Sequence, residues 1–224
     1  MSLLRGRGGL FAALVASGVL LAGAGMLQRS YRAQPGGRPS GELLYYPSGV
    51  WVRQAALGYE TVAADIAWLR AIQYYGEHRL NDQRYDMIGH VMGIVTELDP
   101  RFTEAYVFGA FVLAQELRQP QRGLELLERG MRANPESWRL AFETGFLHYV
   151  STKDYDAAAR YFTRASRVPG HPDYVERFAA FTNQRAGNRG MAILLWKRIE
   201  ATGNKYMQEV ARRELKRLEA TEGI

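Results

Sequence analysis

The chain has 224 residues, of which 47% are hydrophobic, and this is enough for one or two domains with a sizeable core. It contains no cysteine, which excludes disulfides, thiolate metal sites and a cysteine nucleophile. The net charge of +6 comes mostly from residues 1–41, which carry five arginines and no acidic residue, whereas residues 42–224 are almost neutral. This distribution argues against a nucleic-acid-binding surface on the folded part.

A short tail at 1–9 precedes an uncharged apolar segment at 10–27. At a rise of about 1.5 Å per residue, these residues form a helix of about 27 Å, close to the thickness of a hydrocarbon core. Ala22-Gly23-Ala24 resembles a signal-peptidase site, but the apolar run continues beyond it. We therefore expect an uncleaved signal anchor in a bacterial inner membrane. The alternative is cleavage and release of a soluble protein.

The short tail before the apolar segment favours an N-terminus inside the cell, so we expect a single-pass protein with its soluble domain in the periplasm. Residues 28–41 are rich in glycine and proline and are predicted to be a flexible linker. Residues 42–59 contain several aromatic side chains, including Trp51, and a predicted turn at Pro47 to Gly49. We expect this segment to cap the first helices; contact with the membrane interface is the alternative.

From residue 60 onward, helical segments alternate with short polar turns, and one pattern of residues recurs. Ala158, Phe162 and Ala165 are matched 34 residues later by Ala192, Trp196 and Ile199. They are matched 35 residues earlier by Gly123, Leu127 and Gly130. Pro100, Pro135 and Pro169 recur at the same spacing. A period of this length indicates a repeat architecture.

The pattern resembles the tetratricopeptide repeat, a helix–turn–helix unit of about 34 residues. The resemblance implies an all-α, TPR-like helix–turn–helix solenoid that follows one N-terminal transmembrane helix. It places about four units at 60–100, 103–135, 136–170 and 171–202, with a C-terminal capping helix at 204–221. Small residues such as Ala158 and Ala165 are expected where paired helices approach closely. Phe162 is expected to occupy the wedge between units, and Pro169 to end a helix.

No pattern in the sequence argues for catalysis. The four histidines, His78, His90, His148 and His171, show no metal-ligand spacing, and no nucleotide-binding or nucleophile motif occurs. Asp154 and Asp156 stand where an acidic helix N-terminus is expected. We therefore expect no enzyme activity, no cofactor, no metal, no small-molecule substrate and no nucleic-acid partner.

The resemblance also implies a groove lined by the first helix of each unit, which binds protein partners. The residues that it places in this groove are Phe111, Gln115, Glu143, Leu147, Tyr174, Arg177, Phe181 and Arg185. Neighbouring groove positions include Ala114 and Leu140. An apolar groove with arginines at one end fits a peptide that has an apolar stripe and an acidic end.

The function expected on this basis is that of a membrane-anchored scaffold, assembly factor or accessory subunit of a bacterial cell-envelope complex. The alternative is a soluble periplasmic binding or enzyme-accessory protein.

Overall fold

The computed structural model describes residues 17, 18, 22 and 48–220. The chain divides into two compact units, Met1–Glu42 and Leu43–Ile224. The predicted tail at 1–9 and linker at 28–41 lie outside the described residues. So does the predicted span at 10–27, apart from residues 17, 18 and 22, which are helical. Within the described part, no helix is both long enough and apolar enough to cross a membrane.

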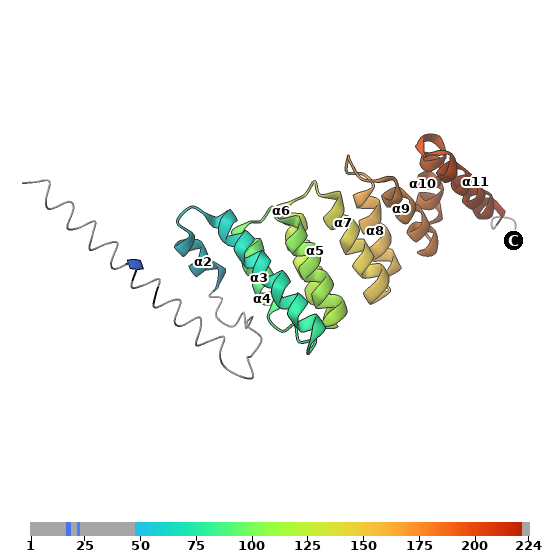
Figure 1. Ribbon diagram of the computed structural model, residues 1–224. Coiled ribbons are helices and arrows are strands. Elements are labelled where there is room, and N and C mark those ends of the chain that lie inside the picture. The colour runs from blue at the N-terminus through green and yellow to red at the C-terminus, as the bar shows by residue number, and fades with distance from the viewer. Residues whose placement is uncertain (1–16, 19–21, 23–47, 221–224) are drawn as a thin grey trace, which may run out of the picture. The chain divides into compact units, whose positions relative to one another are not determined.

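The second unit is all-helical over its described residues (Figure 1). The helices are α2 (Gly49–Ala56), α3 (Glu60–Leu80), α4 (Ile88–Leu98), α5 (Thr103–Phe111), α6 (Pro120–Ala133), α7 (Trp138–Leu147), α8 (Tyr155–Ala165), α9 (Asp173–Arg185), α10 (Arg189–Thr202) and α11 (Lys205–Ala220). Two short π-helical segments, η2 (Val112–Glu116) and η3 (His148–Thr152), directly continue α5 and α7.

The helices of this unit succeed one another in a row, in the order of the sequence (Figure 1). The helices pack as successive pairs: α3 with α4, α5 with α6, α7 with α8, and α9 with α10. Each pair also packs against the next through its second helix, and α5 contacts α7 directly.

Polar contacts join successive pairs at sequence separations of 34 to 36 residues. Asn134 donates its side-chain N–H to the Pro100 carbonyl at 2.8 Å, and Gln115 donates to the Ser151 hydroxyl at 2.8 Å. Arg139 and Glu104 form an ion pair at 3.0 Å. Equivalent positions of neighbouring pairs therefore lie side by side.

Small residues occupy the positions where the helices approach most closely. Ala158 and Ala165 are completely buried, and a Cβ added to Gly123 would lie 2.8 Å from the Ala110 carbonyl oxygen. Similarly, a Cβ on Gly130 would lie 2.8 Å from the Tyr106 ring. These contacts explain why the recurring pattern alternates small and large residues.

One hydrophobic core extends from α3 to α11. Phe162 on α8 lies between neighbouring helix pairs, because its ring contacts Phe142 on α7 at 5.1 Å and Phe178 on α9 at 5.4 Å between centroids. Its predicted place in a wedge is thus confirmed. Asn183, buried nearby, donates to the Thr163 hydroxyl at 2.8 Å and joins α9 to α8.

The helix ends follow the sequence signals in part. Asp154 caps α8, since its carboxylate accepts the Ala157 N–H at 2.9 Å. Helix α8 ends at Ala165, before Pro169. Gly49, predicted to lie in a turn, is instead the first residue of α2.

Candidate functional site

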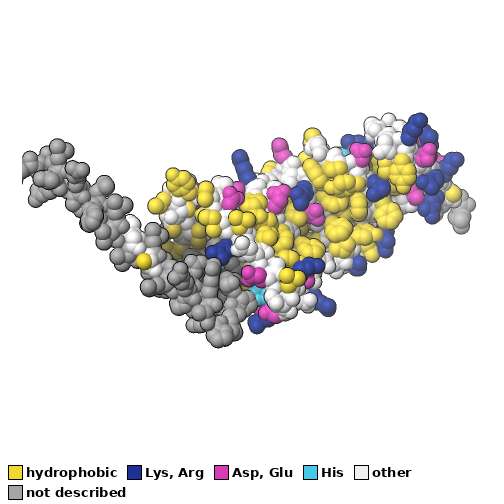
Figure 2. All heavy atoms as spheres, in the orientation of Figure 1, with side chains coloured by type: hydrophobic (Ala, Val, Ile, Leu, Met, Phe, Trp, Pro, Cys, Tyr) yellow, Lys and Arg dark blue, Asp and Glu magenta, His cyan; other side chains and the backbone are white. Residues whose placement is uncertain are grey.

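A concave surface, called here the central groove, is formed mainly by α5 and α7, with Trp68 of α3 at its side. Its volume is about 370 Å³. It is lined by Trp68, Glu104, Val107, Phe108, Ala110, Phe111, Gln115, Leu127, Arg139, Glu143, Phe146 and Leu147. Figure 2 shows that hydrophobic side chains gather over the helices from α5 to α9, with charged side chains among them.

Aromatic side chains hold one wall of the central groove in place. Trp68 on α3 contacts the rings of Phe102 and Phe108 at centroid distances of 5.1 and 5.5 Å. Tyr75 contacts Phe108 edge-on at 5.1 Å. Such tilted and edge-to-face contacts favour one arrangement of the rings, so they help to fix the position of this wall.

Apolar side chains also remain accessible in the groove. Phe111 at the end of α5 is 48% exposed, and Phe146 on α7 is exposed as well. Ala110, Leu127 and Leu147 lie beneath them and are buried. The groove therefore offers aromatic surface over a packed floor.

Polar groups lie at the edge of the groove. Glu104 on α5 and Arg139 on α7 form the 3.0 Å ion pair that bridges the two helices. Burial raises the pKa of the nearby Glu143 carboxyl, and the Arg139 guanidinium partly offsets this effect. Gln115 is held by its hydrogen bond to Ser151.

The structure brings together four of the eight residues predicted to form the binding groove: Phe111, Gln115, Glu143 and Leu147. Leu147 is only 5% exposed and belongs to the floor. Ala114 and Leu140, predicted as neighbouring groove positions, are both buried. The prediction was wrong for these two residues, because Ala114 on η2 and Leu140 on α7 face the core.

Two more predicted residues, Arg177 and Phe181, line a separate hollow of about 290 Å³ that also involves α10 and α11. Gln184 ties this region together, because it accepts the Trp196 indole N–H at 3.2 Å and donates to Glu214 at 3.3 Å. The last helix, α11, thus forms part of this hollow.

The remaining two predicted residues pack against aromatic rings. Tyr174 contacts Phe142 edge-on at 5.3 Å. The Arg185 guanidinium lies 4.4 Å from the centre of the Tyr155 ring and donates hydrogen bonds to the hydroxyls of Tyr155 and Tyr149. Arg185 therefore has partners within the chain.

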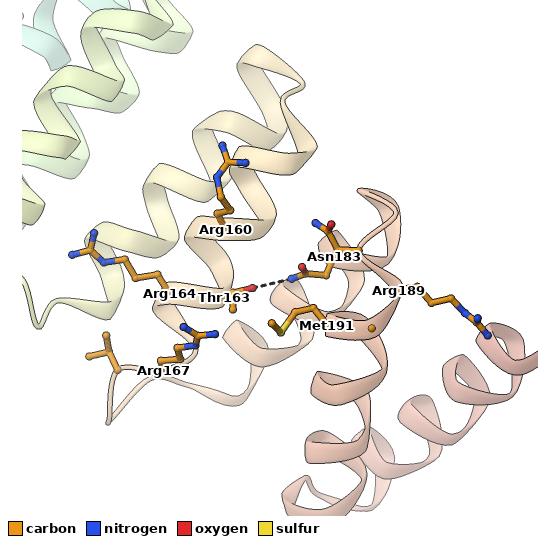
Figure 3. A pocket seen from close by; sticks show the side chains of 10 residues that line it. Arg160, Thr163, Arg164, Arg167, Asn183, Arg189 and Met191 are labelled. Atoms are coloured by element: carbon orange, nitrogen blue, oxygen red, sulfur yellow. Dashed lines mark hydrogen bonds between the residues drawn. The ribbon is translucent and has the colours of Figure 1, made fainter.

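A third concavity, of about 800 Å³, lies between α8 and the start of α10 and has no acidic residue in its lining. Its lining includes Arg160, Arg164, Arg167 and Arg189. In Figure 3 these arginines point in different directions. Arg189 donates to the Leu218 carbonyl on α11 at 2.6 Å. The guanidinium groups do not converge on one point, so they form no compact anion site.

Three aromatic residues that line the groove, Trp68, Phe108 and Phe146, were not predicted from the sequence. Trp68 stands on the helix of the least regular predicted unit, and Phe146 falls between two predicted positions. Their aromatic character and helical spacing were the available signal, but that signal is shared with many core residues.

Among the described residues, no group of three or more histidine and acidic side chains is arranged to hold a metal ion.

In comparisons with known proteins, no family model matches the sequence, and no curated protein matches it significantly.

Proposed function

We propose that this protein is a membrane-anchored protein–protein interaction scaffold, an assembly factor or accessory subunit of a bacterial cell-envelope complex. In this proposal residues 10–27 anchor the chain in the inner membrane, and residues 28–41 give the helical unit its reach. The helices at 60–202 act as a tetratricopeptide-type solenoid. The successive helix pairs, the contacts between residues 34 to 36 apart and the small residues at close approaches support that part.

The observation that carries the proposal is the central groove. It combines exposed aromatic side chains, a buried floor and a pre-packed wall in one concave surface. Exposed apolar surface of this kind, edged by polar groups, is typical of protein-binding sites. Rigid aromatic residues such as Phe111 lose little conformational entropy on binding, so they serve well as anchors.

The partner that fits is a helix or extended segment that places apolar side chains on Phe111 and Phe146. The expectation of an acidic end rested on Arg177 and Arg185, which lie outside the central groove. The proposal for the partner therefore rests on apolar contacts.

The test is site-specific photo-crosslinking in intact cells. A photoreactive residue at Phe111 in the full chain should capture a defined protein, which mass spectrometry identifies. Phe111→Ala should then weaken binding of that purified protein about tenfold or more, as expected for a central aromatic contact.

Phe181 provides the matched control. It is 46% exposed, close to the value for Phe111, but it lies in the hollow beside α11. Phe181→Ala should leave the affinity nearly unchanged. Equal losses from both variants, or no specific adduct from position 111, would contradict a role for the central groove.

A further inference from the structure

Helix α3 has a second apolar face, on the side opposite the core. Ala64, Ala67, Ala71, Tyr74 and His78 form its buried face. At 100° of rotation per residue, Val62, Ile66 and Leu69 point the other way. These three are 51%, 53% and 60% exposed. A surface helix ordinarily carries polar residues on its outer face. An exposed apolar stripe of this kind is typical of an interaction surface.

The spacing of the stripe is that of a coiled-coil seam. Positions 62, 66, 69, 73, 76 and 80 are separated alternately by four and three residues. In heptad terms, Ile66, Gln73 and Leu80 occupy a positions, and Val62, Leu69 and Gly76 occupy d positions. Within this stripe, Ile66 at a followed by Leu69 at d is the combination that favours two parallel helices. A single polar residue at an a position, here Gln73, favours one register.

The charges beside the seam fit a parallel pair of identical helices. Asp65 and Arg70 occupy g and e positions on opposite sides of the stripe, and both are exposed. Within the part of the chain that the structure describes, neither Asp65 nor Arg70 takes part in a hydrogen bond or ion pair. In a parallel pair, Asp65 of each copy lies opposite Arg70 of the other, which gives two complementary contacts.

An antiparallel pair is less favourable. The register with the greatest overlap places Leu69 opposite Gln73 and brings the two Arg70 side chains together. Like charges at such positions repel each other.

We propose that two copies of the chain associate in parallel through this face of α3, with Ile66 and Leu69 at the centre of the contact.

The absence of native cysteine makes a direct test possible. Val62→Cys and Leu69→Cys are introduced singly into the full chain, and isolated membranes are oxidised mildly. Both variants should form a disulfide-linked dimer of twice the chain mass, because a parallel seam places identical d residues opposite each other. Leu194→Cys is the matched control: Leu194 is also 60% exposed but lies on α10. It should remain monomeric.

The second experiment exchanges the charges beside the seam and measures the yield of disulfide-linked dimer in the Leu69→Cys variant. Arg70→Glu places two carboxylates against Asp65 of the opposite copies and should reduce dimer yield about tenfold. Asp65→Arg combined with Arg70→Glu restores opposite charges and should recover the yield.

Several results would overturn the proposal. Dimers from Leu69→Cys without dimers from Val62→Cys would indicate an antiparallel pair, since Val62 then lies far from its counterpart. Adducts to a different protein would indicate a heterologous partner. Monomers alone, with circular dichroism unchanged, would mean that membrane lipid or another segment of the chain covers this face.

Discussion

At the scale of single residues, Glu143 shows how burying a carboxyl group in the wall of a groove lowers stability at neutral pH. Its carboxyl lies in the central groove, half-buried, and burial raises its pKa despite the nearby Arg139. A group with a raised pKa holds its proton more tightly in the folded state. Its favourable contribution is complete below the unfolded pKa and is lost as the pH rises through the folded value.

This gives a prediction for Glu143→Gln. The neutral amide avoids the cost of burying a charge, so the variant should be more stable than the native chain at neutral pH, by about 1 kcal/mol. The difference should vanish at a pH below the ordinary glutamate pKa. Urea unfolding across this range measures it, with Glu136→Gln, an exposed carboxyl, as the control. A difference that does not depend on pH would contradict the argument.

At the scale of helices, the close approach of α6 to α5 depends on Gly123. The Ala110 carbonyl oxygen and a Leu147 methyl group occupy the space that a side chain would need. A backbone atom cannot move aside without shifting its helix, so added volume here is costly.

Gly123→Ala should therefore destabilise the protein by about 1–3 kcal/mol. Gly190 on α10 is the matched position, since a Cβ added there would meet no atom within 4 Å. Gly190→Ala should stabilise by up to about 1 kcal/mol, because alanine favours a helix. Chemical denaturation followed by circular dichroism compares the two. Equal effects would show that close packing does not constrain α6.

The positions of the helices were predicted from the sequence more accurately than the faces on which individual residues lie. Residues 204–221 were expected to form a terminal helix, and α11 spans Lys205–Ala220. The small residues at 123, 130, 158 and 165 were also identified correctly, because their spacing reflects contacts between helices. The π-helical segments η2 and η3 were not predicted, since a shift in backbone hydrogen bonding leaves no residue pattern.

The candidate site was predicted only in part for the same reason. The spacing of a helical pattern predicts which face of the helix a residue lies on with an error of about one position. An error of one position is enough to decide whether a side chain is accessible or buried. Leu140 and Phe146 illustrate the error: the first was predicted in the groove and is buried, and the second was omitted and lines it. Val210 and Glu214 of α11 complete the hollow that contains Arg177 and Phe181, and no local pattern in the sequence shows where α11 packs.

At the scale of the whole molecule, the proposed function depends on whether residues 10–27 stay attached to the helical unit. If they form an anchor, protein purified from membranes should retain its N-terminus and a mass of 25.3 kDa, and alkaline carbonate should not extract it. A chain that begins near Gly25 and is found in the periplasmic fraction would instead support the soluble alternative. Deletion of residues 10–27 is the control and should release the protein from the membrane.

The arrangement of contacts has a mechanical consequence. Each helix packs chiefly on its immediate neighbours. A force applied between the first and last helices would therefore be transmitted through each interface in turn. Small changes of angle at each interface would then add up along the row. A protein tethered at one end and loaded at the other could stretch and recoil while its individual interfaces stay closed.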